Sequence, residues 1–387
     1  MKSQKLRIFV TTSHISTIYM LMYAKKTQKD DVADVLFTDT GFRRQELLDQ
    51  IGDIARLHNW AKFHNFSNPV GGSHDFKPSL RKQITRKVKE WPVLKPIYSL
   101  LLKRHLHKTD QKNMQLVSDV LGQYKNAAEV EIYMMTQTQL NRALIRMYPD
   151  AQRFYMEHGI GDYYYYTDHQ LPKGKFIAVF AEEFKRFLEH RHAENDWISL
   201  LPGIEDFPKL AEQIKLSHHH AGHFPAPKVQ DKPVVFILLE AVDMYHVRDE
   251  FWHQYPEHIL AQLDDPKKYH YILKPHPLHS KHSIVKTKEV FRKSGLSFEL
   301  LTGEKITSIS AEIIFHDYYP QTKHVFCLFS SACFYLSKLY SSKDITFWYS
   351  TEFMSKYTEN APPMYRNLFI DLRPLIDNVF AVNCKNY

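Results

Sequence analysis

Residues 270–283 are His270-Tyr-Ile-Leu-Lys-Pro-His-Pro-Leu-His-Ser-Lys-His-Ser283, and the rest of the chain can be interpreted from this stretch. An apolar run from Tyr269 to Leu273 is typical of a buried strand. The run stops at Lys274-Pro275-His276-Pro277, where two prolines restrict the backbone on both sides of a histidine. We therefore expect His276 to be held rigidly on a loop at the carboxyl end of a strand.

This loop has the composition of a phosphate site. In open α/β sheets, ligands bind beyond the carboxyl ends of the strands. The cation of Lys274 and the imidazole of His276 suit a phosphate or diphosphate-like leaving group, and Pro277 belongs to the same turn. The alternative is a proline-stiffened turn with a surface histidine, because the chain contains 23 histidines.

Strand and helix patterns alternate along the chain. Strand-like runs at 6–12 and 32–38 are followed by helical patterns at 16–25 and 43–57, which predicts a parallel sheet covered by helices. Two more strands of this first set are predicted at 130–135 and 153–156. A second set of strands is predicted at 234–240, 269–273, 297–301 and 324–329. No glycine-rich dinucleotide fingerprint and no Walker-type loop occurs.

Two of the other predicted strands also end in polar side chains. The strand Arg153–Met156 leads into Glu157-His158-Gly159, which places a carboxylate before a glycine. The strand at 324–329 leads into Ser330-Ser331 and a helix, so hydroxyls and free backbone N–H groups meet where an anion would bind. The alternative for the serines is a simple helix N-cap.

Together these motifs suit group transfer from a nucleotide donor. If the two sets of strands face each other, Glu157 lies across a cleft from Lys274, His276, Ser330 and Ser331. A carboxylate there can deprotonate an acceptor hydroxyl, while the opposite side stabilises the departing phosphate. No DXD-like carboxylate cluster is present for a divalent metal, so we expect no metal site.

Length and composition predict two domains. The 387 residues exceed one typical domain, and Ser217–Pro233, with three adjacent histidines and several prolines, has the composition of a linker. We expect an N-terminal Rossmann-like domain at 1–224 and a C-terminal one at 232–387, whose last helix packs back on the first. Histidines 218–220 and 223 suggest a metal site only weakly, because no Cys or acid is spaced to join them.

The charge is concentrated in one segment. Residues 77–108 contain ten Lys and Arg and one acid, so the net charge of this window is +9. The rest of the chain has a net charge of −1, which gives +8 for the whole chain. Such a segment suits nucleic acid, anionic lipid or an acidic polysaccharide, and the common alternative is a solvated helix face. Its predicted contact residues are Arg81, Lys82, Arg86, Lys87, Lys103 and Arg104.

Cysteine use and hydropathy limit the compartment. Three cysteines, of which Cys327 and Cys333 lie in an apolar run, form no disulfide framework, so we expect a reducing compartment. The apolar run after Arg7 is broken by polar residues, and no run of about 18 apolar residues occurs. We therefore predict neither a secretory signal nor a transmembrane helix.

The three motifs resemble those of bacterial sialyltransferases of the GT-B architecture. That family has a two-acid-plus-glycine motif, a His-Pro motif and a paired-serine motif, which are similar to Glu157-His158-Gly159, His276-Pro277 and Ser330-Ser331 in the same order. The resemblance covers about residues 6–350. It departs at the second acid, which is His158 here.

The resemblance implies two Rossmann-like domains facing each other across a cleft, a CMP-sialic acid donor, and inverting, metal-independent transfer without a cofactor. Glu157 would be the general base, and His276 would serve the CMP phosphate together with Ser330 and Ser331. Lys274 is added to the phosphate site on its charge and position. The basic segment gives the chain the look of the capsular polysialyltransferase branch, which would make a sialylated polysaccharide the acceptor, with α-2,8 linkage.

Several alternatives remain open. They are a lipooligosaccharide sialyltransferase, a teichoic-type polyol-phosphate transferase, and a non-enzymatic protein that binds polyanions or nucleic acid. The teichoic-type enzymes usually carry an Asp soon after the serines, and Ser330–Ser337 contains none. No nucleic-acid-binding motif is present, so we expect no nucleic-acid partner. We expect a cytoplasmic protein, either free or peripheral on the inner membrane with the capsule machinery.

Overall fold

The computed structural model describes most of the chain. It covers residues 5–39, 45–65, 111–135, 139–168, 174–220, 231–240, 242, 247–277, 279–328, 330–341, 344–358 and 372–387.

The N-terminal half is built on a seven-stranded sheet. All of its strand pairs are parallel, in the order β3-β2-β1-β4-β5-β6-β7. Its strands are β1 (Lys5–Thr11), β2 (Val32–Thr38), β3 (Lys62–Asn65), β4 (Glu129–Met134), β5 (Gln152–Met156), β6 (Lys175–Ala178) and β7 (Ile198–Leu200). Its helices are α1 (His14–Lys26), α2 (Gln45–Ala55), α5 (Gln139–Met147), α6 (Ile160–Asp168), α7 (Ala181–His190) and α8 (Phe207–His220).

The C-terminal half is built on a second parallel sheet of six strands, in the order β10-β9-β8-β11-β12-β13. Its strands are β8 (Val234–Leu239), β9 (His270–Pro275), β10 (Ser297–Leu300), β11 (Thr322–Phe326), β12 (Thr346–Tyr349) and β13 (Cys384–Asn386). Its helices are α9 (Asp249–Leu260), α10 (Lys281–Lys293), α11 (Glu304–Ser308), α12 (Ala311–Tyr318), α13 (Ser331–Leu339) and α14 (Thr351–Tyr357). The prediction of an α/β fold with two Rossmann-like halves is confirmed.

The strands are buried for a common reason. In β1, β8 and β9 nearly every residue is buried, which is the pattern of a parallel strand with helices on both faces. The prediction of a buried strand at 269–273 is confirmed, and the strand continues through Lys274 and Pro275. Cys327 and Cys333 are buried free thiols, as expected.

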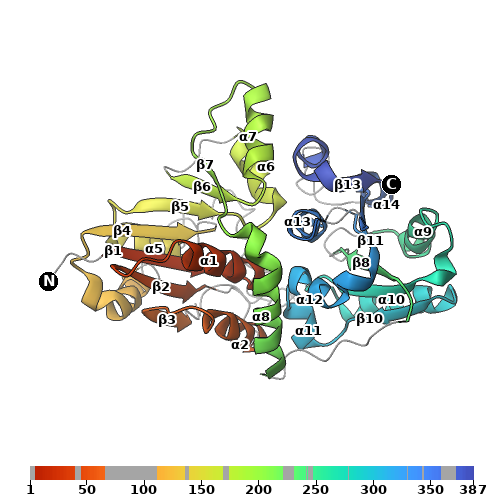
Figure 1. Cartoon of the computed structure of the whole chain (residues 1–387), viewed down its shortest axis with the longest axis horizontal. Helices are drawn as coiled ribbons and strands as arrows, with labels where there is room; N and C mark the ends of the chain where they lie inside the picture. The colour runs from red at the N-terminus through yellow and green to blue at the C-terminus, as the bar shows by residue number, and fades with distance from the viewer. Residues whose placement is uncertain are drawn as a thin grey trace, which may run out of the picture.

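The two halves lie side by side with α8 running down the junction between them (Figure 1). Helix α8 packs on α2 of the N-terminal half and on α12 of the C-terminal half. The ion pair between Lys215 of α8 and Asp317 of α12, at 2.9 Å, belongs to this junction. Near the C-terminus, Phe380 packs edge-on against Tyr163 and Phe180 of the N-terminal half.

One sequence-based prediction is wrong. Residues 217–220 were assigned to a linker, but they form the last turn of α8. The reason is the buried face of this helix, on which Leu210, Ile214 and His218 recur at helical spacing. Within the part of the chain that the structure describes, no helix is long and apolar enough to cross a membrane.

Candidate functional site

Two of the three sequence motifs are in contact across the junction. The backbone N–H of Ile160 donates to Ser331 Oγ at 3.3 Å, and a Cβ on Gly159 would lie 3.4 Å from the same oxygen. This distance is that of a van der Waals contact, so the loop packs directly against the start of α13. The loop at 157–159 and the start of α13 therefore form one site built from both halves.

Glu157 lies at the bottom of this site and is enclosed. Its side chain is 1% exposed at the carboxyl end of β5. Oε2 accepts hydrogen bonds from the hydroxyl of Tyr163 and the N–H of Val179, both at 2.5 Å, and Oε1 accepts one from the hydroxyl of Tyr335. Tyr163 and Val179 belong to the N-terminal half, whereas Tyr335 belongs to α13, so the carboxyl group connects the two halves.

Burial dominates the electrostatics of Glu157. Removal from water disfavours the charged carboxylate and raises the pKa of Glu157 to about 8, although the three hydrogen-bond donors act in the opposite direction. Burial also raises the pKa values of Tyr163 and Tyr335 well above their usual range, so both hydroxyls keep their protons and can donate. The group is therefore poised to ionise just above neutral pH.

His158 and Asp162 shape the loop that follows. His158 is exposed, and its backbone N–H donates to Asp162 Oδ2 at 2.6 Å. Asp162 lies in the first turn of α6, where a carboxylate can close the N-terminus of the helix. Burial raises the pKa of Asp162, and the His158 imidazole opposes this shift.

The paired serines lie where the strand order of the second sheet reverses. β8 and β11 are neighbours in the sheet, and Ser330 and Ser331 follow β11. Ser330 is the N-cap of α13, but its side chain makes no capping hydrogen bond. Both serines are partly buried. The carboxyl edge at such a reversal, next to the free N–H groups of a helix, is suited to bind an anion.

His276 and Pro277 lie at the same edge, two strands away. They follow β9, and β8 separates β9 from β11, so roughly 10 Å separates the two strand ends at about 5 Å per strand. His276 is partly buried and Pro277 is exposed. Burial and the nearby Lys274 cation lower the pKa of His276 to about 4, so its imidazole is neutral at physiological pH.

Lys274 points into the protein. Its side chain is 3% exposed, and Nζ donates to the carbonyl oxygens of Pro275 at 2.9 Å and Thr307 at 3.3 Å. Burial lowers the pKa of Lys274 to about 8, while the Glu312 carboxylate opposes this shift. In this arrangement the ammonium group is bound by backbone, and its role as a phosphate ligand stays a prediction.

A buried chain of polar groups joins the halves beside this site. His14 Nδ1 lies 3.2 Å from Ser310 Oγ, and His14 Nε2 lies 2.9 Å from Nε2 of His218. His218 Nδ1 in turn lies 3.2 Å from Asp53 Oδ2. The expectation that no acid would join the histidines of this stretch is therefore wrong for His218. In the described ranges, no group of three or more His, Cys, Asp or Glu side chains is arranged to hold a metal ion.

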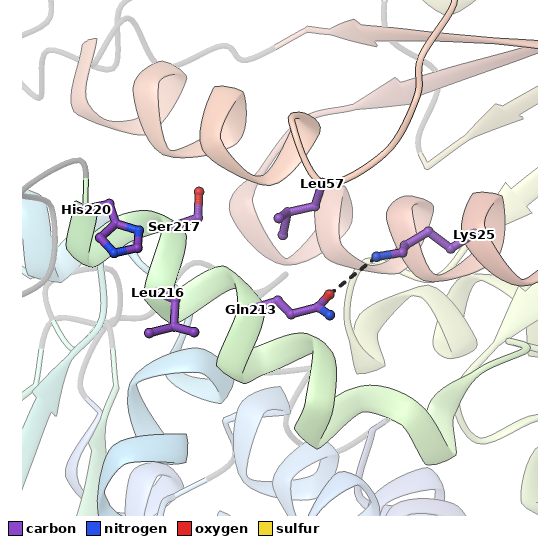
Figure 2. A pocket seen from close by; sticks show the side chains of 6 residues that line it. All are labelled: Lys25, Leu57, Gln213, Leu216, Ser217 and His220. Carbon is purple, nitrogen blue, oxygen red and sulfur yellow. Dashed lines mark hydrogen bonds between the residues drawn. The ribbon is translucent and has the colours of Figure 1, made fainter.

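The predicted acceptor contacts cannot be placed. Arg81, Lys82, Arg86, Lys87, Lys103 and Arg104 lie outside the described residues. A groove of about 560 Å³ lies elsewhere, where α8 meets the ends of α1 and α2 (Figure 2). Its lining residues are Lys25, Leu57, Gln213, Leu216, Ser217 and His220. None of these six residues belongs to the three sequence motifs.

Sequence reasoning missed the tyrosines around Glu157. Tyr163 packs against Phe176 and Phe184 in the aromatic core and also donates to the Glu157 carboxyl group. Tyr335 was not singled out at all. The available signal was its spacing, since it follows Ser331 by four residues and must lie on the same face of a helix that begins there.

Comparisons with known proteins bear on the fold. No protein-family model matches the chain, and no curated protein sequence is significantly similar to it. Among solved structures, UDP-GlcNAc 2-epimerase from Methanocaldococcus jannaschii matches with a TM-score of 0.52 at 14% identity, over 99% of this chain and 89% of that chain. The UDP-GlcNAc 2-epimerase from Neisseria meningitidis matches with a TM-score of 0.51 at 13% identity, over 89% and 82%.

A third match is the GT-B domain of a sialyltransferase from Photobacterium damselae, with a TM-score of 0.46 at 10% identity over 99% and 98% of the two chains. This likeness is too distant to bear on substrate. The two stronger matches agree with the two parallel sheets and with the paired Rossmann-like halves. The chain therefore has the GT-B fold.

Proposed function

We propose that this chain is a glycosyltransferase that moves sialic acid from CMP-sialic acid to a hydroxyl group of a sialylated acceptor. The observation that carries the proposal is the contact between the Glu157–Gly159 loop and the start of α13 with its paired serines. It brings a carboxyl group and an anion-binding helix start to one site between two Rossmann-like halves. The order of the three motifs supports sialic acid as the transferred group.

In the proposed reaction the acceptor oxygen attacks C2 of sialic acid from the face opposite the phosphate. The acceptor O–H bond breaks and its proton passes to Glu157, while the new C2–O bond forms. The bond from C2 to the phosphate oxygen breaks, and its electron pair leaves with CMP. Ser330, Ser331 and the α13 N–H groups hold the departing phosphate, and His276 donates a hydrogen bond or a proton to it.

Glu157 must become accessible for this step, because it is enclosed in the structure described here. The acceptor hydroxyl can reach Oε1 only after the contact with Tyr335 has been replaced. The acceptor in this proposal is an anionic glycan, most simply a growing polysialic acid chain extended in α-2,8 linkage. The basic segment at 77–108 would bind it.

A ligand panel tests the donor, and a transfer assay tests the reaction. We expect CMP to raise the melting temperature of the protein, while UDP, CDP-glycerol and oligonucleotides do not. The four ligands represent the sialyl, epimerase-like, teichoic and nucleic-acid alternatives in turn. We also expect labelled sialic acid to pass from CMP-sialic acid to an oligosialic acid acceptor. Stabilisation by CDP-glycerol with no response to CMP would move the chain to the polyol-phosphate transferases, and linkage analysis of the product would identify the bond.

A further inference from the structure

Helix α13 makes three polar contacts with the N-terminal half from one of its faces. Ser331 accepts from the Ile160 N–H, Tyr335 donates to Glu157, and Lys338 forms an ion pair with Glu183 of α7. These three residues are spaced by four and three positions, which places them in one stripe along the helix. The helix start proposed to hold the donor phosphate is therefore rigidly connected to the hydroxyl that covers Glu157.

The two oxygens of Glu157 differ in which half binds them. Oε2 is held by Tyr163 and by the N–H of Val179, which both belong to its own half. Oε1 is bound by Tyr335 of the opposite half. A substrate that enters between the halves can displace the Tyr335 hydroxyl from Oε1, but it cannot displace Tyr163 and Val179 from Oε2. Oε1 is therefore the oxygen that can accept a proton from a substrate.

We propose that the Tyr335 hydroxyl holds Oε1 of Glu157 until an acceptor hydroxyl replaces it, which makes Tyr335 a positioning residue for transfer. This inference rests on the proposed function. The replacement is chemically matched, because a tyrosine O–H and a sugar O–H both donate one hydrogen bond to a carboxylate oxygen. It also ties the base to the position of α13, so that Glu157 is uncovered when the helix that holds the donor moves.

The surroundings of Glu157 give this contact a measurable effect. The titratable groups that act on it include Tyr163 and Asp162 of α6, Tyr19 of α1 and Tyr335. The hydroxyl donors are thus the main groups that favour the ionised carboxylate, against the effect of burial. Removing the Tyr335 hydroxyl leaves Oε1 buried without that donor and makes the carboxyl group harder to ionise.

The test compares Tyr335→Phe with two matched variants. Tyr19→Phe removes another buried hydroxyl of the same aromatic cluster, one that has no hydrogen-bond partner in the described structure and whose ring packs edge-on against Tyr335. Lys338→Gln weakens the contact of α13 with the opposite half without touching Glu157. The measurement is the pH dependence of kcat/KM for the acceptor, with CMP-sialic acid saturating.

In the wild-type protein we expect kcat/KM to rise through a pH of about 8. In Tyr335→Phe the rise moves up by roughly one to two pH units, the size expected for a lost hydrogen bond to a charged group. At pH values above both transitions, the KM of the variant for the acceptor falls severalfold below that of the wild type, because no tyrosine hydroxyl competes with the acceptor for Oε1. The pH profiles of kcat/KM for Tyr335→Phe and the wild type therefore cross. The profiles of Tyr19→Phe and Lys338→Gln do not cross the wild-type profile.

An equal loss of kcat/KM at every pH in Tyr335→Phe, or a crossing in Tyr19→Phe as well, would overturn the proposal. An infrared titration, which needs no turnover, tests the coupling between Tyr335 and Glu157 separately from the proposed function. The carboxylic acid C=O band that Glu157→Gln removes from the infrared spectrum should disappear at a higher pH in Tyr335→Phe than in the wild type. If no sialic acid is transferred while this shift is found, the donor assignment fails and the coupling stands. If the band titrates identically in both proteins, the coupling fails.

Discussion

At the scale of single residues, Glu157 can be tested by a substitution that preserves its shape. Glu157→Gln keeps an acceptor oxygen for a tyrosine hydroxyl but cannot take up a proton from the acceptor. General-base catalysis contributes roughly 10²–10⁴ in rate, so we expect kcat of the variant to fall by about that factor. The measurement is initial velocity at saturating donor and acceptor, with circular dichroism to confirm the fold.

His158 supplies the control for this substitution. It is the neighbouring residue, it is exposed, and an imidazole can act as a base near neutral pH. His158→Ala should leave kcat within a few-fold of the wild type if Glu157 is the base. Near-normal turnover in Glu157→Gln together with a large loss in His158→Ala would transfer the assignment to His158.

His276 should respond to the donor in a pH-dependent way. Its pKa is lowered to about 4 in the ligand-free protein, chiefly by burial and then by Lys274, so it is neutral at pH 7. A phosphate anion nearby favours the imidazolium and raises this pKa, so binding takes up a proton. Affinity for CMP should therefore increase as pH falls below neutral, by at most about tenfold per pH unit.

The comparison of wild type with His276→Ala removes the effect of the titration of CMP itself. We expect the dissociation constant of the variant to depend less on pH and to be weaker throughout, and its turnover to be lower. Isothermal titration calorimetry in two buffers of different ionisation enthalpy would measure the proton uptake directly. Parallel pH profiles in the two proteins would show that His276 does not bind the phosphate.

At the scale of elements, the last turn of α8 holds three others in place. His218 is 0% exposed and lies between His14 of α1 and Asp53 of α2, and His14 continues to Ser310 ahead of α12. Burial and the neighbouring His218 and Lys274 lower the pKa of His14 well below its usual range. The stability that neutral His14 contributes is therefore present above its ordinary pKa of 6.5 and is lost as pH falls below it.

Replacement of His218 tests this chain. His218→Leu leaves the buried carboxyl group of Asp53 and the ring of His14 each without one partner, so we expect the free energy of unfolding to fall by about 2–4 kcal/mol. His219→Leu changes the adjacent exposed position and should stay within about 0.5 kcal/mol of the wild type. Urea unfolding at pH 7.5 measures both. Equal losses in the two variants would mean that the effect comes from the helix end and not from the buried chain.

The sequence predicted the elements better than the contacts between them. β2 was predicted with its observed bounds, because period and punctuation are local properties of the chain. The helical end of α8 was missed since three histidines gave no apolar signal, and Asp53, which binds one of them, lies 165 residues away. The site was found through its motifs, but the enclosure of Glu157 depends on Tyr335, 178 residues away, which no local pattern could supply.

At the scale of the whole molecule, the junction between the halves contains two buried acids, Glu157 and Glu312. The pKa of Glu157 is raised to about 8 and that of Glu312 to about 7, in both cases chiefly by burial. A carboxyl group whose pKa is raised by burial favours the closed, protonated state below its ordinary pKa of about 4.5, and this contribution is lost as pH rises through the raised value. The closed arrangement of the two halves should therefore become less stable as pH rises from about 4.5 to 8. An acceptor must enter at this same junction between the halves.

The basic segment gives the chain its positive charge, and its partner can be tested through substrate length. Reversing the charges at Arg81, Lys82, Arg86 and Lys87 removes cations that a long anionic glycan would contact together. Each exposed contact is worth only about 0–1 kcal/mol, but several add along a polymer. We therefore expect KM to rise more for long acceptors than for short ones, and products to become shorter, because a loosely held chain leaves between additions.

Salt and a matched surface provide the controls. The screening length is about 8 Å at physiological ionic strength, so added salt should reduce the preference of the wild type for long acceptors and leave the variant nearly unchanged. Reversing the same number of exposed charges on α10 of the other half, at Lys281, Lys288, Arg292 and Lys293, changes net charge equally and should leave product length unaltered. KM for CMP-sialic acid should hardly change in the variant of the basic segment, because the paired serines lie on the C-terminal half. If long and short acceptors suffer equally, the segment is a solvated surface or a contact with the membrane, and chain length must be controlled elsewhere.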